Sequence, residues 1–200
     1  MEDDPAPNPR RVRLFLAAKG VSVPEVRVPL REGAHKSPEH LARNAAGQVP
    51  TLELDDGTHL SETVAICRYL EHLYPEPPMF GRTPLEQAQV DQWTRRVEFR
   101  LMNPVGMFWV HAHPLTARII NQHKDFGESN RETVRRALLW LDGQLAGREW
   151  LATADYTIAD ICLQTTIDFA EWIGLEVPAE AEALKAWRGR AAGATASAAA

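Results

Sequence analysis

The pattern of apolar and polar residues predicts three helices in the first part of the chain. Over 10–19, apolar residues share one side of a helix, which Gly20 would end because glycine readily adopts a left-handed backbone. Over 37–44, a serine followed by a proline predicts a short helix, with the serine as N-cap and the proline as first helical residue. A third helix is expected over 61–74, where apolar residues return at helical spacing.

Between these helices the pattern is that of strands. Residues 25–30 alternate apolar residues with polar residues or proline, which predicts a half-buried strand. Residues 49–54 and 58–60 flank the sequence Asp-Asp-Gly, which is typical of a hairpin turn. The order helix, strand, helix, hairpin, helix fits half of a small α+β sandwich.

A proline-rich segment divides the chain. Residues 75–84 contain four prolines and a glycine, which neither a helix nor a central strand accommodates. We therefore expect a domain over 1–76, a linker over 77–83 and a second domain over 84–200.

Every segment beyond the linker has a helical pattern. Thr157 and Asp160 form a capping box at the start of one helix, whose apolar residues make a single buried stripe. The alanine-rich end, 191–200, is expected to fray. The four expected helices are 84–110, kinked at Pro104, then 128–145, 158–172 and 179–190.

Composition and charge exclude several classes of protein. Hydrophobic residues make up 44% of the chain and charged residues 24%, as in ordinary globular proteins. The net charge of −5 argues against a nucleic-acid partner. No apolar run approaches the roughly 18–20 residues of a membrane span, and the acidic first residues do not resemble a signal peptide. Two cysteines provide neither a disulfide framework nor a four-ligand metal site. We expect a cytoplasmic protein without a metal or a membrane partner.

Two short segments carry candidate binding chemistry. The Val49–Pro50 bond precedes a strand and is a candidate for the cis form, which would turn neighbouring backbone groups toward an extended peptide. Glu62 and Thr63 stand at the start of a helix, where free N–H groups and a hydroxyl bind a carboxylate and a glutamate binds an ammonium group. Together they would hold an amino-acid head group. Plain capping of the helix by residues 61–63 is the alternative interpretation.

Residues 41–74 resemble the glutathione-binding half of soluble glutathione S-transferases of the bacterial type. Val49-Pro50, Glu62-Thr63 and the later capping box, in this order and spacing, carry the resemblance. It implies an α+β thioredoxin-like N-terminal domain, an all-α C-terminal domain and a homodimer. It also implies an enzyme of detoxification that joins the thiolate of glutathione, its co-substrate, to a hydrophobic electrophile.

The resemblance assigns glutathione-binding roles residue by residue. Val49 would pair its backbone with the cysteinyl part of glutathione, beside a cis Pro50. Glu62 and Thr63 would hold the γ-glutamyl ammonium and carboxylate groups. Three further residues would lie near the glycyl carboxylate: His35, Lys36 and Gln48.

The start of the first helix departs from the family pattern. Ala6 occupies the position where a serine commonly donates a hydrogen bond to the glutathione sulfur. The amide of Asn8 is the candidate substitute, and N-capping before Pro9 is its alternative role. Arg10 and Arg11 oppose the helix dipole, so a solvated basic face is expected there, although a bound anion would relieve the conflict.

A second departure concerns the first strand of the family fold. Residues 1–5 cannot form a central strand, because they consist of three acidic residues, the initial methionine and a proline. Either the true start lies upstream or the sheet lacks this strand, and we favour the first explanation because a missing central strand would expose part of the core.

The second substrate is expected between the domains, where small-molecule pockets commonly form. The residues we expect to line its pocket are Phe108, Trp109 and His111. Two alternatives to a transferase remain: a glutathione-binding or structural module of the same fold without activity, favoured by Ala6, and a glutathione-dependent isomerase or peroxidase.

Overall fold

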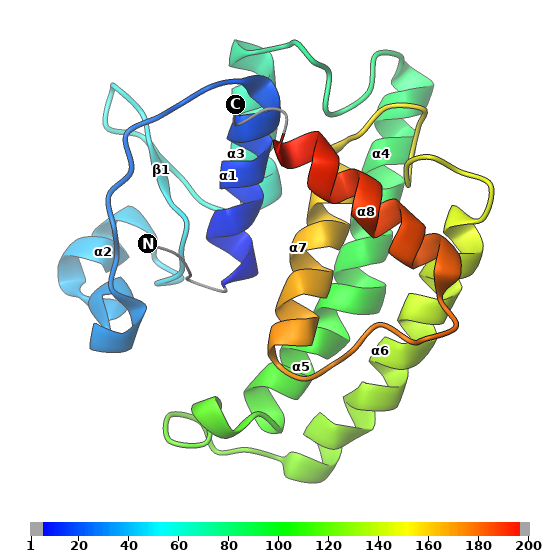
Figure 1. Ribbon diagram of the computed structural model, residues 1–200. Helices are drawn as coiled ribbons and strands as arrows, with labels where there is room; N and C mark the ends of the chain where they lie inside the picture. Colours follow the sequence, from blue (N-terminus) through cyan, green and yellow to red (C-terminus); the bar gives the residue numbers. More distant parts are fainter. Residues whose placement is uncertain (1–5, 197–200) are drawn as a thin grey trace.

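Helix α1 (Pro7–Lys19) lies at the centre of the computed structural model, which describes residues 6–196. It packs against α3 (Thr63–Leu73) and against α7 (Ile158–Trp172), which belongs to the helical half of the molecule (Figure 1). Phe15 and Leu16 are buried, and Gly20 ends the helix with φ 65°, as predicted. Helix α1 therefore joins the two halves of the chain.

The rest of the N-terminal half is small and contains little sheet. It consists of two 3-10 turns, η1 (Leu30–Glu32) and η2 (Ala34–Lys36), then α2 (Pro38–Arg43), β1 (Leu52–Glu53) and β2 (His59–Leu60). The Ser37 hydroxyl accepts a hydrogen bond from the backbone N–H of His40, which confirms the predicted N-cap. Strands β1 and β2 pair antiparallel, with Leu52 opposite Leu60, so the hairpin is confirmed, although it is short.

The strand predicted over 25–30 is wrong. This segment has no regular structure before η1, and Val26 is 85% exposed. Alternation favours a strand only where a neighbouring strand offers hydrogen bonds, and β1 and β2 form the only sheet in residues 6–196. Pro24 and Pro29 also lack the N–H groups that a ladder requires. The prediction about the first strand falls on residues 1–5, which lie outside the described part.

The segment between α3 and α4 (Pro84–Val97) has no regular structure but is held firmly. Met79 and Phe80 are buried, and the Met79 carbonyl accepts a hydrogen bond from the N–H of Ile158 at 2.9 Å. The Lys19 ammonium group, at the end of α1, lies 2.6 Å from the Glu71 carboxylate of α3.

The proposed domain limits of 1–76, 77–83 and 84–200 remain a prediction.

The long helix predicted over 84–110 is interrupted before Pro104. Helix α4 continues into the π-helical segment η3 (Glu98–Met102) and then into α5 (Asn103–His111). Pro104 has no N–H group to bond the carbonyl four residues earlier, which explains why the helix widens at this point.

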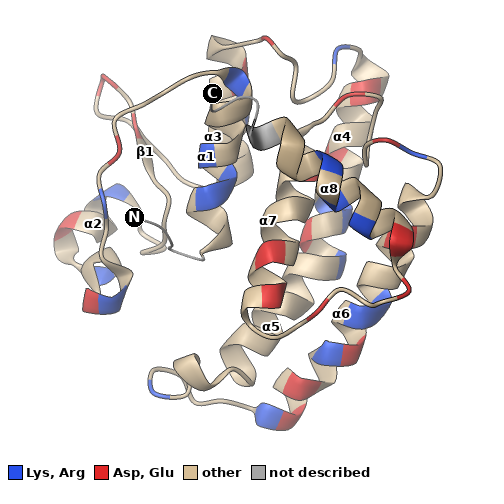
Figure 2. Cartoon of the chain, viewed as in Figure 1, with Lys and Arg blue, Asp and Glu red and all other residues tan. Residues whose placement is uncertain are grey.

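The remaining helices complete the second half. A 3-10 turn, η4 (Pro114–Thr116), leads to α6 (Lys124–Leu145), and α8 (Glu182–Ala196) ends the described chain. Charged residues of both signs lie along α6 (Figure 2). The predicted fraying is wrong for the described part of the alanine-rich segment: the helix continues through it and Ala191 is fully buried.

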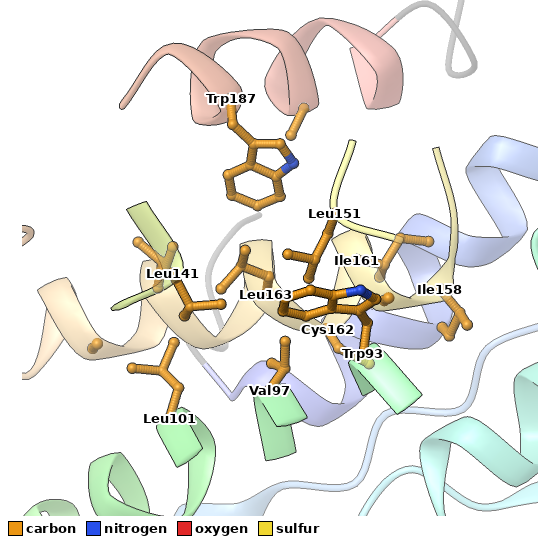
Figure 3. Close-up of a cluster of buried hydrophobic side chains, with 14 of the residues drawn as sticks. Trp93, Val97, Leu101, Leu141, Leu151, Ile158, Ile161, Cys162, Leu163 and Trp187 are labelled. Carbon is orange, nitrogen blue, oxygen red and sulfur yellow. The ribbon is translucent and has the colours of Figure 1, made fainter. Parts of the chain in front are cut away.

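The core of the helical half is built around α7 (Figure 3). Side chains from α4, η3, α6 and α8 meet it, with Trp187 of α8 closing one side. The predicted capping box is confirmed, because Asp160 bonds the backbone and the hydroxyl of Thr157. The predicted single stripe is too narrow: α7 is buried on nearly all sides except near Trp172, which is 45% exposed.

No helix within residues 6–196 has the length and apolar character needed to cross a membrane.

Candidate active site

Helix α1 begins at Pro7, one turn earlier than the apolar pattern indicated. Ala6 is the N-cap and no side chain caps this end, so Asn8 is the second helical residue and its predicted alternative role as N-cap is wrong. The first turn contains no acidic residue, and Asn8 is half-buried. Helix N–H groups without helical partners carry partial positive charge, so this end of α1 favours a negatively charged group.

Arg10 and Arg11, in the first turns of α1, do not form a solvated basic face. Arg10 pairs with Asp168 of α7. Arg11 is 2% exposed, and its Nη1 donates a hydrogen bond to the Thr63 hydroxyl at 2.7 Å. Sequence reasoning missed this buried arginine. The available signal was spacing, because Arg11, Phe15 and Lys19 recur every four residues on the buried face of α1.

The loop before β1 places a cis proline at its end. The Val49–Pro50 bond is cis, as predicted, and both residues are half-buried. The preceding Gln48 is exposed, but its carbonyl accepts hydrogen bonds from the His40 ring at 2.9 Å and from the Asn44 amide at 3.0 Å. Helix α2 thus fixes the backbone that leads to Val49.

Glu62 adopts a conformation that side chains rarely take. Its φ is 67°, and it is the only described residue other than glycine with positive φ. Such backbone conformations cost about 1–3 kcal/mol and concentrate at functional sites. The Glu62 side chain is exposed and makes no capping hydrogen bond with α3. Helix capping by this side chain therefore does not explain the strained backbone of Glu62. Thr63, the first residue of α3, is 7% exposed.

His35 and Lys36 lie in turn η2, beside the loop that carries Gln48. Lys36 is exposed and donates a hydrogen bond to the Ala46 carbonyl at 3.1 Å. The His35 Nδ1 is buried without a hydrogen-bond partner in the described part of the chain. Burial, followed by the neighbouring Lys36 and His40, lowers the pKa of His35. The ring is therefore mostly neutral near pH 7, which leaves Lys36 as the cation in this turn.

A small apolar cavity of about 50 Å³ adjoins the start of α1. It lies between α1, α5 and α7, where the two halves of the chain meet. The lining residues are Pro7, Met102, Val105, Gly106, Thr166 and Phe169.

The structure places the three predicted pocket residues outside this cavity. Phe108 is 3% exposed and belongs to the core. The His111 ring faces Phe126 of α6, at 5.5 Å between centroids. Trp109 contacts the cavity residue Phe169 edge-on, at 5.5 Å. The π-helical segment η3 precedes α5, so these residues do not keep the helical phase of the single helix predicted over 84–110.

Trp109 belongs to an aromatic cluster that extends from the cavity toward solvent. Its ring lies 4.8 Å from the ring of His113 and 5.6 Å from that of Trp172, while Phe169 and Trp172 stack at 6.0 Å. Burial lowers the pKa of His113. The cluster is an apolar surface continuous with the cavity through Phe169.

Residues 6–196 contain no group of three or more histidine, cysteine, aspartate or glutamate side chains arranged to hold a metal ion.

Two family models match the chain. The N-terminal domain of glutathione S-transferases matches residues 6–73 and the C-terminal domain matches residues 102–193. Glutathione S-transferase 2 of Saccharomyces cerevisiae is 40% identical over 190 residues, which cover 92% of this chain and 82% of the yeast protein. The chain belongs to the glutathione S-transferase family. Proteins of this family use glutathione as a co-substrate.

One solved structure and one further relative are also similar to this chain. The crystal structure of Gtt2 from Saccharomyces cerevisiae superposes with a TM-score of 0.86 at 38% identity, covering 93% of this chain and 91% of that one. Maleylacetoacetate isomerase of Pseudomonas aeruginosa is 30% identical over 179 residues, 84% of this chain and 79% of the isomerase. The predicted fold, a thioredoxin-like domain followed by an all-helical domain, is confirmed, and so is the predicted glutathione transferase function at the level of the family.

Proposed function

We propose that this glutathione transferase joins the thiolate of glutathione to a hydrophobic electrophile at the junction of α1, α3 and α7. The observation that carries the proposal is the strained backbone of Glu62. This residue places a carboxylate that makes no capping hydrogen bond beside Thr63, at the start of α3. Strain of this kind is expected where a ligand must be held.

Glutathione would lie along the N-terminal half of the molecule. The Val49 backbone pairs with the cysteinyl part, next to the cis Pro50, while Glu62 binds the γ-glutamyl ammonium and Thr63 the carboxylate beside it. Lys36 attracts the glycyl carboxylate, with His35 and Gln48 nearby. Two observations support this arrangement: the exposed positions of Glu62 and Lys36, and the hydrogen bonds that fix the loop at Gln48.

The sulfur would lie at the start of α1, where thiol activation is an electrostatic effect. A free thiol has a pKa of roughly 8.5, and lowering it by about two units requires about 2.7 kcal/mol of preferential interaction with the anion. The partial positive charge of the helix end and the Asn8 amide provide donors for that anion. The thiol proton passes to solvent.

The acceptor would bind with its reactive end toward the small cavity and its apolar body along the aromatic cluster. The thiolate sulfur then attacks the electrophilic carbon. With an aryl halide, a carbon–sulfur bond replaces the carbon–halogen bond and the halide leaves with the bonding electron pair. His111 faces α6 rather than the cavity, so we assign it no part in this step.

Turnover of an aryl halide by the wild type and by Asn8→Ala tests the proposal, together with a spectroscopic thiol titration of bound glutathione. We expect turnover in the wild type, a bound-thiol pKa below that of free glutathione, and a higher thiol pKa in Asn8→Ala. A bound thiol that titrates like the free tripeptide would contradict the proposed activation.

A binding module without turnover is the second candidate, and Ala6 is the observation that favours it, because its side chain has nothing to donate to a sulfur. Retention on immobilised glutathione without turnover in either protein would support the module. A glutathione-dependent isomerase or peroxidase would share the glutathione site, and comparing acceptor classes separates these reactions from conjugation.

We also propose that the chain forms a homodimer through the outer face of α5 and α6. This face carries a hollow of about 530 Å³ lined by η3, α5 and α6. Two of the lining residues are exposed aromatics, Phe99 at 67% and Phe126 at 50%. Exposed aromatic residues around a hollow are typical of protein interfaces. Light scattering should give the mass of two chains for the wild type and of one for Phe99→Arg, whereas Leu85→Arg, which changes another exposed residue, should remain dimeric.

We propose the cytoplasm as the location of the protein. Cys67 and Cys162 are both free and buried, an arrangement that suits a reducing compartment.

A further inference from the structure

Arg11 is a buried cation that three elements hold in place. Its side chain leaves α1 and is 2% exposed. Nη1 donates a hydrogen bond to the Thr63 hydroxyl of α3 at 2.7 Å, and Nη2 lies 3.2 Å from the Met102 sulfur of η3. The same guanidinium group thus contacts a residue proposed to bind glutathione and a residue that lines the apolar cavity.

The charge of Arg11 is only partly compensated. The closest carboxylate, that of Glu98, is 4.0 Å from Nη1, and Glu98 is closer to Arg95, at 2.8 Å. The Arg11 Nε is buried and has no hydrogen-bond partner among the described residues. A buried cation without a close counter-ion is costly, so its presence beside a binding site indicates that a negatively charged group completes it.

The hydrogen bond to Arg11 determines what the Thr63 hydroxyl can do. A hydroxyl has one proton to donate and lone pairs to accept with. Because a guanidinium group has no acceptor, Thr63 must accept from Arg11, and its own proton remains available for another group. Thr63 is therefore oriented as a donor, which suits a carboxylate.

We propose that Arg11 is a positioning residue for the α-carboxylate of the γ-glutamyl unit of glutathione. It holds Thr63 as a donor toward that carboxylate and adds a buried positive charge behind it. This inference rests on the proposed function, in which Thr63 binds this carboxylate, and adds Arg11 to the residues that select the tripeptide.

Lysine cannot replace Arg11 in this role. The planar guanidinium presents two nitrogens at once, one to Thr63 and one to Met102, whereas a lysine ammonium is a single flexible point charge. A lysine would keep the positive charge but would not fix the direction of the Thr63 hydroxyl.

The test compares glutathione with an analogue whose γ-glutamyl unit is replaced by 4-aminobutyrate, which removes only the α-carboxylate. Calorimetry gives both dissociation constants for the wild type, Arg11→Met, Arg11→Lys and Thr63→Val. The control is Arg13→Met, which removes an arginine of the same helix whose side chain is 44% exposed. Thermal melting confirms that each variant is folded.

We expect the wild type and Arg13→Met to prefer glutathione by about tenfold or more, the effect of a hydrogen bond to a charged group. Arg11→Met and Thr63→Val should lose most of this preference, and Arg11→Lys should retain part of it. A general loosening of the fold would raise both dissociation constants by the same factor and leave their ratio unchanged. If Arg11→Met does not fold, Arg11→Lys and Thr63→Val decide the outcome.

Two negative results have different meanings. A wild type that binds both compounds equally contradicts the proposed role of Thr63 and the proposed glutathione site. A wild type that prefers glutathione, together with a folded Arg11 variant that keeps the full preference, overturns the role of Arg11 alone.

Discussion

The Asp160 carboxylate and the Trp187 indole nitrogen lie 2.9 Å apart in the core of the helical half, where both side chains are fully buried. The same carboxylate accepts hydrogen bonds from the N–H of Leu151 and from the N–H and hydroxyl groups of Thr157. One aspartate therefore connects the start of α7, the loop before it and helix α8. Burial raises the pKa of Asp160, while these hydrogen bonds favour its charged form.

Asp160→Ala should lower the free energy of unfolding by about 3 kcal/mol or more. The substitution leaves four buried donors unpaired, each at a cost of about 1–3 kcal/mol before relaxation. Thermal unfolding measures the effect, and each kcal/mol corresponds to roughly 2–4 °C in a chain of this size. Asp155→Ala, at a side chain that is 62% exposed, is the control. Equal melting temperatures for the two variants would show that the Asp160 network contributes little.

The sequence is informative where a local signal decides the structure. Ser37, Gly20 and the Thr157–Asp160 box were assigned correctly because caps depend on a few neighbouring residues. The strand over 25–30 was predicted wrongly because alternation says nothing about the partner that a strand needs.

The site depends on contacts between segments far apart in the chain. Arg11 meets Thr63 across 52 positions, and Phe169 meets the start of α1 only through the packing of α7. In the sequence, Arg11 is one of three arginines between 10 and 13, and their charges do not reveal which one is buried. Phe169 was assigned to a core stripe, and only the packing of the helices shows that it borders a cavity.

Lowering the pH below about 6.5 should reduce the stability of the protein through His35 and His113. Both have a lowered pKa in the folded state, so the unfolded chain takes up protons first as the pH falls. Stability is then highest above the ordinary histidine pKa and falls as the pH decreases toward the folded values. Urea unfolding between pH 7.5 and 5.5 measures this slope. His113→Phe, which keeps an aromatic ring against Trp109, should flatten it, whereas His72→Gln, at an exposed position, should not.

Glu62→Ala and Glu62→Gly should separate strain from binding. Both variants lose the carboxylate, so each should bind glutathione more weakly by about 1.5–3 kcal/mol, the range for a charge-assisted hydrogen bond. Glycine accepts a φ of 67° without steric cost, so Glu62→Gly should be more stable than Glu62→Ala by about 1 kcal/mol. Calorimetry and thermal unfolding measure the two effects, and unchanged affinity in both variants would remove Glu62 from the site.

Phe169→Ala should weaken binding of the electrophilic acceptor and leave glutathione binding unchanged. The Phe169 ring lines the apolar cavity at the start of α1 and stacks with Trp172. Its removal therefore takes away the apolar contact that the cavity and the aromatic cluster share. Loss of an aromatic contact of about 0.5–1.5 kcal/mol predicts an acceptor KM roughly two- to tenfold higher. Steady-state kinetics with an aryl halide gives this KM, and calorimetry gives the glutathione Kd. Leu115→Ala, which changes an apolar residue that is 59% exposed and outside the cavity, should alter neither value. An unchanged acceptor KM in Phe169→Ala would place the acceptor elsewhere on the molecule.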